Sequence, residues 1–346
     1  MSDFLYNLWY VAAPGAQVKR GKTLAKIILG QAVLLGRDNS GVVFAIRDFC
    51  PHRGVPLRYG KFDGETIECC YHGWCFNTGG QCTKVPTLLP DDKTDISRIK
   101  TGSYPCQEVD GNIWIFIPPP KTRVPETLPA IPVAPAVLKH NYYHVDSIIF
   151  PCDADHAIIG LMDPSHGPFV HASWWWRSRK SMHIKEKKFE PHGLGFRMVR
   201  HKPSANSRAY KILGGERSTE ISFQLPGLRT EHIRIGNRNV ILLTALTPID
   251  ENRTELHQFM YTDIGFINLL RPLLAPFGKA FIRQDLEIVK KQQEGLKGDQ
   301  PSLMLLGDAD AQALWYYRLK KDYLEAQAND TPFTNRVPEK TLRWQS

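Results

Sequence analysis

Two short loops, each offering one thiol and one imidazole at close spacing, constrain this chain more than any other feature. The first loop holds Cys50 and His52, and sixteen residues separate it from the second, which holds Cys69 and His72. Glycines surround both loops, as tight turns closing over a metal group require: Gly54, Gly60, Gly73, Gly79 and Gly80. The pattern predicts one metal group shared by two loops.

Two kinds of metal group suit this set of ligands. In a Rieske [2Fe–2S] cluster two cysteines hold one iron and two histidines hold the other. In a structural zinc site two cysteines and two histidines form a tetrahedron. Zinc-binding arms usually space two cysteines by two to four residues, and mixed Cys-x-His arms are unusual there. The spacing therefore favours the Rieske cluster and predicts a protein that handles single electrons.

The choice of the second thiol is open from spacing alone. Cys69 and Cys70 are adjacent, and Cys70-Tyr71-His72 repeats the Cys-x-His spacing of the first arm. The two arms together resemble the Rieske motif of the Rieske non-haem iron oxygenases, C-x-H followed by C-x2-H. This resemblance implies the ligands Cys50, His52, Cys69 and His72. Cys70 then stands where such proteins often carry proline, as a spare thiol beside the cluster.

Length and composition suit a globular protein of two domains. The chain has 346 residues, 42% hydrophobic and 23% charged, and no apolar stretch approaches the roughly 18–20 residues that span a bilayer. The first residues lack the basic and long apolar regions of a signal peptide. Seven cysteines, four of them near the proposed cluster, argue against a disulfide framework. We therefore expect a cytoplasmic protein without membrane association.

The net charge of +9 invites a nucleic-acid interpretation, which the pattern does not support. There is no run of five or more basic residues and no nucleic-acid-binding motif. The basic residues form scattered clusters: Arg177, Arg179 and Lys180; Lys185, Lys187 and Lys188; Arg197, Arg200 and Lys202. Two interpretations stay open, a solvated surface and a positive face that steers an acidic electron donor such as a ferredoxin or flavin reductase.

The fold class predicted is α+β in two domains. Residues 1–120 are expected to form an all-β Rieske domain, with strand-like runs at 42–46 and 113–117. Pro118-Pro119-Pro120 indicates a linker. Residues 121–346 are expected to form a catalytic domain with an antiparallel sheet and helices.

Four elements are predicted in the second domain: strands over 142–150 and 240–246, and helices over 276–294 and 308–328. Pro276 suits the first turn of its helix, and Asp308 is a plausible N-cap of the other. Trp315, Leu319 and Tyr323 share one face of the last helix at i, i+4 and i+8, which predicts packing against a core.

A second set of metal ligands follows in this domain. His166 and His171 lie five positions apart, close to Asp163. A lone pair of histidines at this spacing is a weak signal, but an electron-carrying cluster upstream makes a redox metal the expected occupant. Two histidines and one carboxylate hold non-haem Fe(II) with positions open for O2.

Asp285 is the candidate for the third ligand. The residues three and four positions away are apolar, namely Phe281, Ile282, Ile288 and Val289. On a helix this places Asp285 on the buried stripe, whereas Glu287 falls on the wet face. A buried carboxylate requires a metal or another cation, so a buried salt bridge is the alternative.

The sequence Asp163-x2-His166-x4-His171 resembles the mononuclear-iron motif of the same family, and Asp285 lies where the family's carboxylate ligand falls. The resemblance covers essentially the whole chain. It implies that Asp163 hydrogen-bonds to an iron-ligand histidine and contacts a Rieske histidine of a neighbouring subunit, here His72 of another chain. One departure is Gly160, which stands where an asparagine is often found.

The resemblance implies the terminal oxygenase component of a Rieske oxygenase system. Electrons from NAD(P)H would arrive through a reductase or ferredoxin, and O2 would be used to hydroxylate or to O- or N-dealkylate an aromatic compound. The compact length resembles homotrimeric enzymes such as the vanillate and dicamba demethylases. Trp174-Trp175-Trp176 suits core, subunit interface or substrate stacking.

Four alternatives stay open at this point. An aromatic ring cis-dihydroxylating dioxygenase is one, and a non-aromatic hydrophobic substrate is another form of the same chemistry. A Rieske electron-transfer protein without oxygenase activity would need only about the first 120 residues, and a zinc-bearing basic binding protein would be colourless.

Overall fold

The computed structural model describes residues 4–134, 144–172, 182–203, 216–297 and 303–346. Its contacts divide the chain into two compact units, 1–133 with 247–250 and 134–246 with 251–346. The domain boundary at residue 120 stays a prediction. Trp174–Trp176 and the basic residues 177–180 lie outside the described residues. No helix among the described residues is long and apolar enough to cross a membrane.

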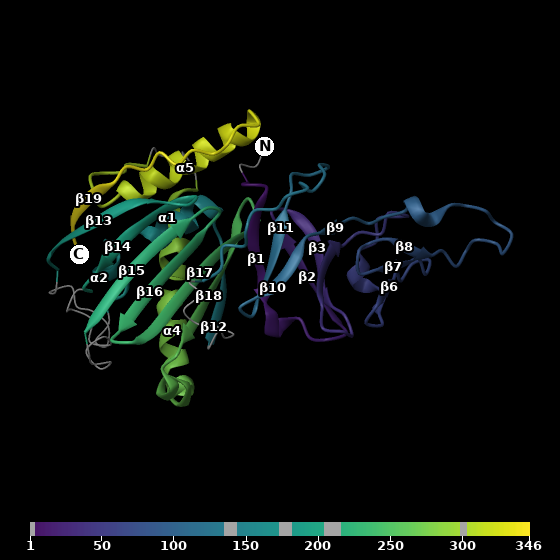
Figure 1. The fold of residues 1–346 in the computed structure, drawn as a ribbon, viewed down its shortest axis with the longest axis horizontal. Helices are drawn as coiled ribbons and strands as arrows, with labels where there is room; N and C mark the ends of the chain where they lie inside the picture. Colours follow the sequence, from purple (N-terminus) through teal and green to yellow (C-terminus); the bar gives the residue numbers. More distant parts are fainter. Residues whose placement is uncertain (1–3, 135–143, 173–181, 204–215, 298–302) are drawn as a thin grey trace. The chain divides into compact units, whose positions relative to one another are not determined.

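The first unit is built from strands, as predicted (Figure 1). Three sheets contain β1 (Leu8–Pro14), β11 (Asn112–Ile117) and β10 (Cys106–Val109); β2 (Lys22–Ile28), β3 (Gln31–Arg37), β4 (Val43–Arg47) and β9 (Ser103–Tyr104); and β5 (Lys61–Phe62), β6 (Thr66–Glu68), β7 (Cys75–Asn77) and β8 (Cys82–Lys84). Three short 3-10 helices are η1 (Gly15–Gln17), η2 (Leu57–Tyr59) and η3 (Ile96–Arg98).

The two cysteine–histidine loops are anchored at the ends of these strands. One follows β4 and the other joins β6 to β7. Cys50 and Cys69 are buried in a core cluster with Leu34, Ile46 and Phe76. The aliphatic and aromatic residues of the flanking strands, which favour a pleated and half-buried surface, therefore hold both thiols inside the unit.

The second unit is an eight-stranded antiparallel sheet with helices, as predicted (Figure 1). In spatial order the strands are β12 (His144–Phe150), β18 (Arg253–Thr262), β17 (Arg238–Asp250), β16 (Leu228–Ile235), β15 (Arg217–Gln224), β14 (Gly195–His201), β13 (Ile184–His192) and β19 (Lys340–Gln345). The helices are α1 (Ala154–Met162), α2 (Gly167–Val170), α4 (Gly265–Gly295) and α5 (Ala311–Ala328). The helix α4 packs on β12, and α5 packs on α1.

Two helix starts differ from the prediction. The helix α4 begins at Gly265, so Pro276 lies in its interior. Proline removes one N–H donor from the helix but keeps a helical φ. The packing of α4 on β12 supports the helix here. Asp308 is not an N-cap, because α5 begins at Ala311. The Asp308 carboxylate instead accepts hydrogen bonds from Lys340 Nζ at 2.8 Å and Arg343 N at 3.0 Å, both of β19.

The predicted packing face of α5 is confirmed, and it supports a stability prediction. Leu319 is 1% exposed, whereas Leu314 on the same helix is 49% exposed. Leu319→Ala is expected to lower the free energy of unfolding of the second unit by about 2–5 kcal/mol, because it leaves a cavity in the core. Leu314→Ala should change it by less than about 0.5 kcal/mol. Chemical denaturation measures both; equal effects would contradict this packing.

Candidate metal centres

The two cysteine–histidine loops share one main-chain geometry. The carbonyl oxygens of Cys50 and Cys69 accept hydrogen bonds from Gly54 N at 2.9 Å and Gly73 N at 3.0 Å, each four residues further on. Each cysteine N–H in turn donates to the carbonyl five residues further on, at 2.9 and 2.8 Å. Both glycines have positive φ, +78° and +67°, which favours glycine over any other residue.

This repeated geometry favours Cys69 over Cys70 as the counterpart of Cys50. Cys69 is 2% exposed and its side chain contacts that of Cys50, whereas Cys70 is exposed. Burial raises the pKa of the Cys50 thiol to about 11, and the neighbouring Cys69 adds to the shift. Because metals bind thiolates, a positive metal group is needed to draw the proton from such a buried thiol.

The two histidines of these loops lie side by side. The ring centroids of His52 and His72 are 4.6 Å apart, and the His52 ring stacks on Trp74 at 4.6 Å. Burial lowers the pKa of His52, and repulsion from His72 acts in the same direction. Neutral imidazoles beside paired thiols are the donor set of a Rieske cluster, in which two Cys and two His ligands bind different irons.

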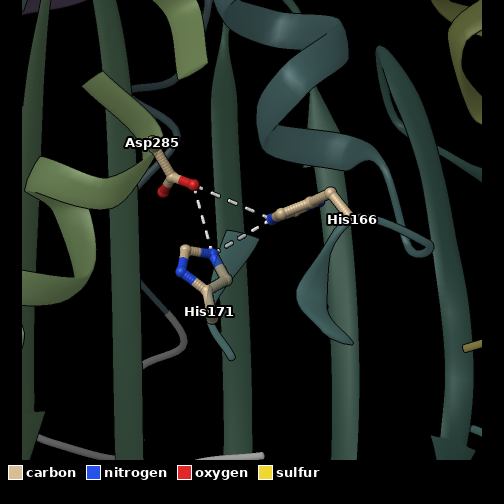
Figure 2. Close-up of side chains that lie close together, drawn as sticks. All are labelled: His166, His171 and Asp285. Carbon is tan, nitrogen blue, oxygen red and sulfur yellow. Dashed lines mark hydrogen bonds and ion pairs between the residues drawn. The ribbon is translucent and has the colours of Figure 1, made fainter. Parts of the chain in front are cut away.

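The second centre brings together His166, His171 and Asp285, and Figure 2 shows the three side chains pointing toward one another. The two Nε2 atoms of the histidines are 3.1 Å apart. Asp285 Oδ1 lies 3.1 Å from His171 Nε2 and 3.8 Å from His166 Nε2. Burial lowers the pKa of His166 and the His171 ring adds to this, against the opposite effect of Asp163 and Asp285.

The other ring nitrogens show why a cation fits among these three residues. His166 Nδ1 donates to the main-chain oxygen of Asp163 at 2.8 Å, and His171 Nδ1 lies 3.0 Å from the side-chain oxygen of Gln284. In its neutral form, a ring that donates from Nδ1 carries a lone pair on Nε2. Two such lone pairs and a carboxylate oxygen would then converge on one point. A metal ion suits this arrangement, and two His with one carboxylate form the facial triad of non-haem iron.

The local sequence explains how the two imidazoles meet. The helix α1 ends at Met162, and the carboxylate of Asp163 accepts a hydrogen bond from Ser165 N at 2.6 Å, which turns the chain. His166 and His171 then flank the single helical turn of α2. One detail differs from the prediction: the carboxylate of Asp163 is 3.7 Å from His166 Nδ1, and its main-chain oxygen accepts the hydrogen bond instead.

Asp285 comes from α4, on a face that is less buried than predicted. Ile282 and Val289 are buried as expected, but Ile288 is 44% exposed and the Asp285 side chain is 32% exposed. Glu287 lies on the wet face, as predicted. Asp285 therefore remains accessible on one side while its carboxylate meets the buried His171 on the other.

Gln284 is a functional residue that the sequence interpretation missed. Its side-chain oxygen lies 3.0 Å from His171 Nδ1 and so fixes the tautomer and orientation of that ring. Nothing in its type or spacing distinguishes it from other helix residues. Only the contact between α4 and α2 shows that positions 284 and 285 serve the same imidazole.

Gln284→Leu is expected to weaken iron binding at the second centre by about 10- to 100-fold, because the His171 ring loses the acceptor that orients it. Gln284→Glu keeps an oxygen at this position and should retain most of the affinity. Titration of the metal-depleted protein with Fe(II) measures both constants, with the visible absorbance of the cluster as internal control. Equal affinities of the leucine and glutamate variants would contradict the orienting role.

Comparisons with known proteins agree with the two kinds of metal group. The chain matches the Rieske [2Fe-2S] domain over residues 8–103 and the vanillate O-demethylase oxygenase C-terminal domain over residues 151–326, about half of its length. The Rieske domain implies a [2Fe–2S] cluster, and the oxygenase domain family uses mononuclear iron. The first match contains Cys50 and Cys69, and the second contains His166 and His171.

Among curated relatives, the chain is 34% identical to the oxygenase component of dicamba O-demethylase from Stenotrophomonas maltophilia, over 49% of this chain and 48% of that protein. It is 36% identical to 4beta-methylsterol monooxygenase from Methylococcus capsulatus, over 36% and 34% of the two chains. The alignments with the first relatives span between 25% and 59% of those proteins.

Among solved structures, dicamba monooxygenase bound to dicamba has the same fold, with a TM-score of 0.72 at 21% identity over 95% of this chain and 100% of that one. Pseudomonas putida CBB5 NdmA with caffeine gives 0.73 at 18% identity over 93% and 92%. A Rieske unit followed by a sheet-and-helix unit is therefore a shared fold. The chain belongs to the Rieske oxygenases with a vanillate O-demethylase-type C-terminal domain.

Proposed function

We propose that this chain is the terminal oxygenase component of a Rieske oxygenase system. The observation that carries the proposal is the convergence of one ligand atom each from His166, His171 and Asp285 within 4.8 Å of one another. An electron-transfer protein without oxygenase activity would not need this second centre or the unit that builds it. Zinc chemistry does not account for a chain that also contains a Rieske domain.

The residues of the chain have separable roles in this proposal. The cluster is held by Cys50, Cys69, His52 and His72. Because the two imidazoles are half-exposed, electrons can leave the buried cluster through them. His166, His171 and Asp285 hold iron, which when bound supplies O2 activation at its open positions. Electrons come from NAD(P)H through a ferredoxin or flavin reductase. The protein supplies geometry and ligands for chemistry that belongs to the metals.

The reaction favoured is monooxygenation of an aromatic compound, by hydroxylation or by O- or N-dealkylation. Two relatives support it by name: dicamba O-demethylase and the 5,5'-dehydrodivanillate O-demethylase oxygenase subunit of Sphingobium. The 3-chlorobenzoate-3,4-dioxygenase oxygenase subunit of Comamonas testosteroni is also similar, but demethylases recur in both the sequence and the family matches. Cis-dihydroxylation is therefore the second candidate. A cytoplasmic location remains part of the proposal, since all seven cysteines are free.

We also propose that the active assembly is a homotrimer in which the cluster of one subunit faces the iron of the next. A pocket of about 160 Å³ beside Asp163 supports a docking face there; its lining includes Gly160, Gln292 and Gln312. Leu303, Met304 and Leu306 are 52%, 77% and 63% exposed in the segment that contributes to this pocket. On the Rieske unit Tyr71 is 61% exposed next to His72. Apolar groups exposed at both sites suit mutual burial.

Anaerobic purification followed by iron analysis and a substrate assay tests the proposal. We expect a red-brown protein with about three irons per chain, two in the cluster and one in the second centre. With a reductase and NADH, an aryl methyl ether should yield formaldehyde together with O2 uptake. A coloured protein with two irons and no turnover after Fe(II) loading would identify an electron carrier, and a colourless zinc protein would refute the whole assignment.

Asp163→Asn is expected to keep both metals and to slow electron delivery to the second centre about 10- to 100-fold. Asparagine preserves the side-chain oxygen that caps Ser165 and the main-chain oxygen that holds His166, so the iron ligands stay in place. Only the charge proposed to link the two imidazole systems is lost. Single-turnover measurement of Rieske oxidation, at matched iron content, gives the rate; an unchanged rate would refute the linking role.

A further inference from the structure

We propose that a row of polar side chains on the sheet binds a hydrogen-bond donor of the substrate, a phenolic hydroxyl or an amine N–H, and disfavours a carboxylate there. This inference rests on the oxygenase function proposed above and names the substrate class of the same site. The polar row consists of one residue from each of the neighbouring strands β16, β17, β18 and β12: Arg229, Thr244, Gln258 and Asp146.

The four residues lie on one face of the sheet. Arg229 stands opposite Thr244 in the register of β16 and β17, and Gln258 stands opposite Asp146 in the register of β18 and β12. Gln258 Nε2 donates to Thr244 Oγ1 at 3.5 Å, which connects the two pairs. Because directly opposed residues of antiparallel strands project to the same side, the polar row is continuous across four strands.

The polar row faces the helix that carries Asp285. A Cβ atom on Gly278 would come within 3.1 Å of Asp146 Oδ2, so the carboxylate lies against α4. Gly278, Phe281 and Asp285 are spaced at i, i+3 and i+7 and share one helix face. Phe281 lies between the other two and stacks on His171 with ring centroids 3.6 Å apart. Gly278, against which Asp146 lies, and Asp285 are about 10 Å apart along the axis of α4, a span suited to a single substituted aromatic ring.

The charges at the Asp146 end decide what the polar row can bind. His144 Nε2 and Asp146 Oδ2 are 2.9 Å apart, with side chains 19% and 16% exposed. In the described part of the chain no lysine or arginine pairs with this carboxylate, and His144 Nδ1 is buried without a hydrogen-bond partner. At the other end of the row, Arg229 is paired with Glu231 at 3.1 Å.

These contacts present acceptors rather than donors. In its neutral form, a His144 ring that donates from Nε2 to Asp146 carries a lone pair on Nδ1, and no lysine or arginine among the described residues pairs with the Asp146 carboxylate. A hydroxyl or N–H group of the substrate satisfies these acceptors. A substrate carboxylate would have to lose its water next to a like charge, which is unfavourable.

Equilibrium binding to the iron-loaded protein tests the proposal with three aryl methyl ethers: para-methoxyphenol, para-methoxybenzoate and anisole. Calorimetry should rank the phenol tightest and the benzoate weakest. Asp146→Asn should weaken the phenol about tenfold or more, leave anisole unchanged and tighten the benzoate. The matched control is Glu287→Gln, a carboxylate on the wet face of α4 that pairs with Lys290; it should leave all three constants unchanged.

Other outcomes would overturn the proposal. They are tighter binding of the benzoate than of the phenol by the unchanged protein, no measurable binding of the phenol, or an equal loss for all three ligands in Asp146→Asn, which would indicate a structural role. The ranking by the unchanged protein decides the matter even where a variant is unstable. Formaldehyde release is measured in parallel: the expected ranking without formaldehyde would support the polar row and contradict the demethylase function.

Discussion

Replacing His166 by alanine is expected to abolish substrate oxidation while the absorbance of the Rieske cluster stays unchanged. The His166 Nε2 atom is one of three converging ligand atoms, and its loss leaves His171 and Asp285 to hold iron alone. Two ligands from one side do not retain Fe(II) in competition with water and buffer. Iron content should therefore fall by about one per chain, from about three to about two.

Absorption spectroscopy, iron analysis and formaldehyde release together decide this prediction. His192→Ala is the matched control, since His192 ends β13 and belongs to neither centre; it should keep full iron content and turnover. Loss of the visible absorbance in His166→Ala would mean that the two centres have been assigned to the wrong histidines. Full turnover in the variant would remove His166 from the iron site altogether.

Replacing Cys69 by alanine is expected to destroy the Rieske cluster, whereas replacing its neighbour Cys70 should leave the cluster intact. Cys69 is 2% exposed and contacts Cys50, and its loop repeats the hydrogen bonds of the Cys50 loop. Cys70 is exposed to solvent, and the first loop has no thiol at the corresponding position. The pair of variants differs by one position, so general effects of losing a thiol are controlled.

Visible absorption and acid-labile sulfide quantify the cluster in both variants. Cys69→Ala should yield a colourless protein that keeps at most the mononuclear iron, and substrate oxidation should cease because electrons no longer reach the second centre. A coloured Cys69→Ala together with a colourless Cys70→Ala would reverse the ligand assignment. Retention of colour in both variants would show that either thiol can bind the iron.

The candidate metal ligands could be named from the sequence because metal chemistry restricts residue type and spacing. Cys50, His52, His166 and His171 followed from short motifs, and Asp285 followed from its place on a helix face. Only main-chain hydrogen bonds and burial favour Cys69 over Cys70, and both depend on how the loop folds. Spacing alone carries no information on which of two adjacent residues points inward.

Features that depend on contacts between distant segments could not be predicted. Strand β19 pairs with β13 from the end of the chain, in a mostly polar stretch where only Leu342 and Trp344 alternate with polar residues. Lys340 of this strand donates a hydrogen bond to Asp308, which the local sequence alone predicts to be a helix cap. The predicted start of α4 is wrong because proline favours the first turn of a helix, whereas α4 begins at Gly265 and continues through Pro276.

The repeated loop geometry has a consequence for how the cluster is assembled. The four hydrogen bonds that the two loops share, made by the two cysteine N–H groups, Gly54 N and Gly73 N, join main-chain atoms only. Because these bonds need no bound cluster, we expect them to keep the loops in shape without one and cluster insertion to cost little conformational entropy. After removal of the cluster, the protein should accept a new one without unfolding. The fold of the Rieske unit would then not depend on the cluster.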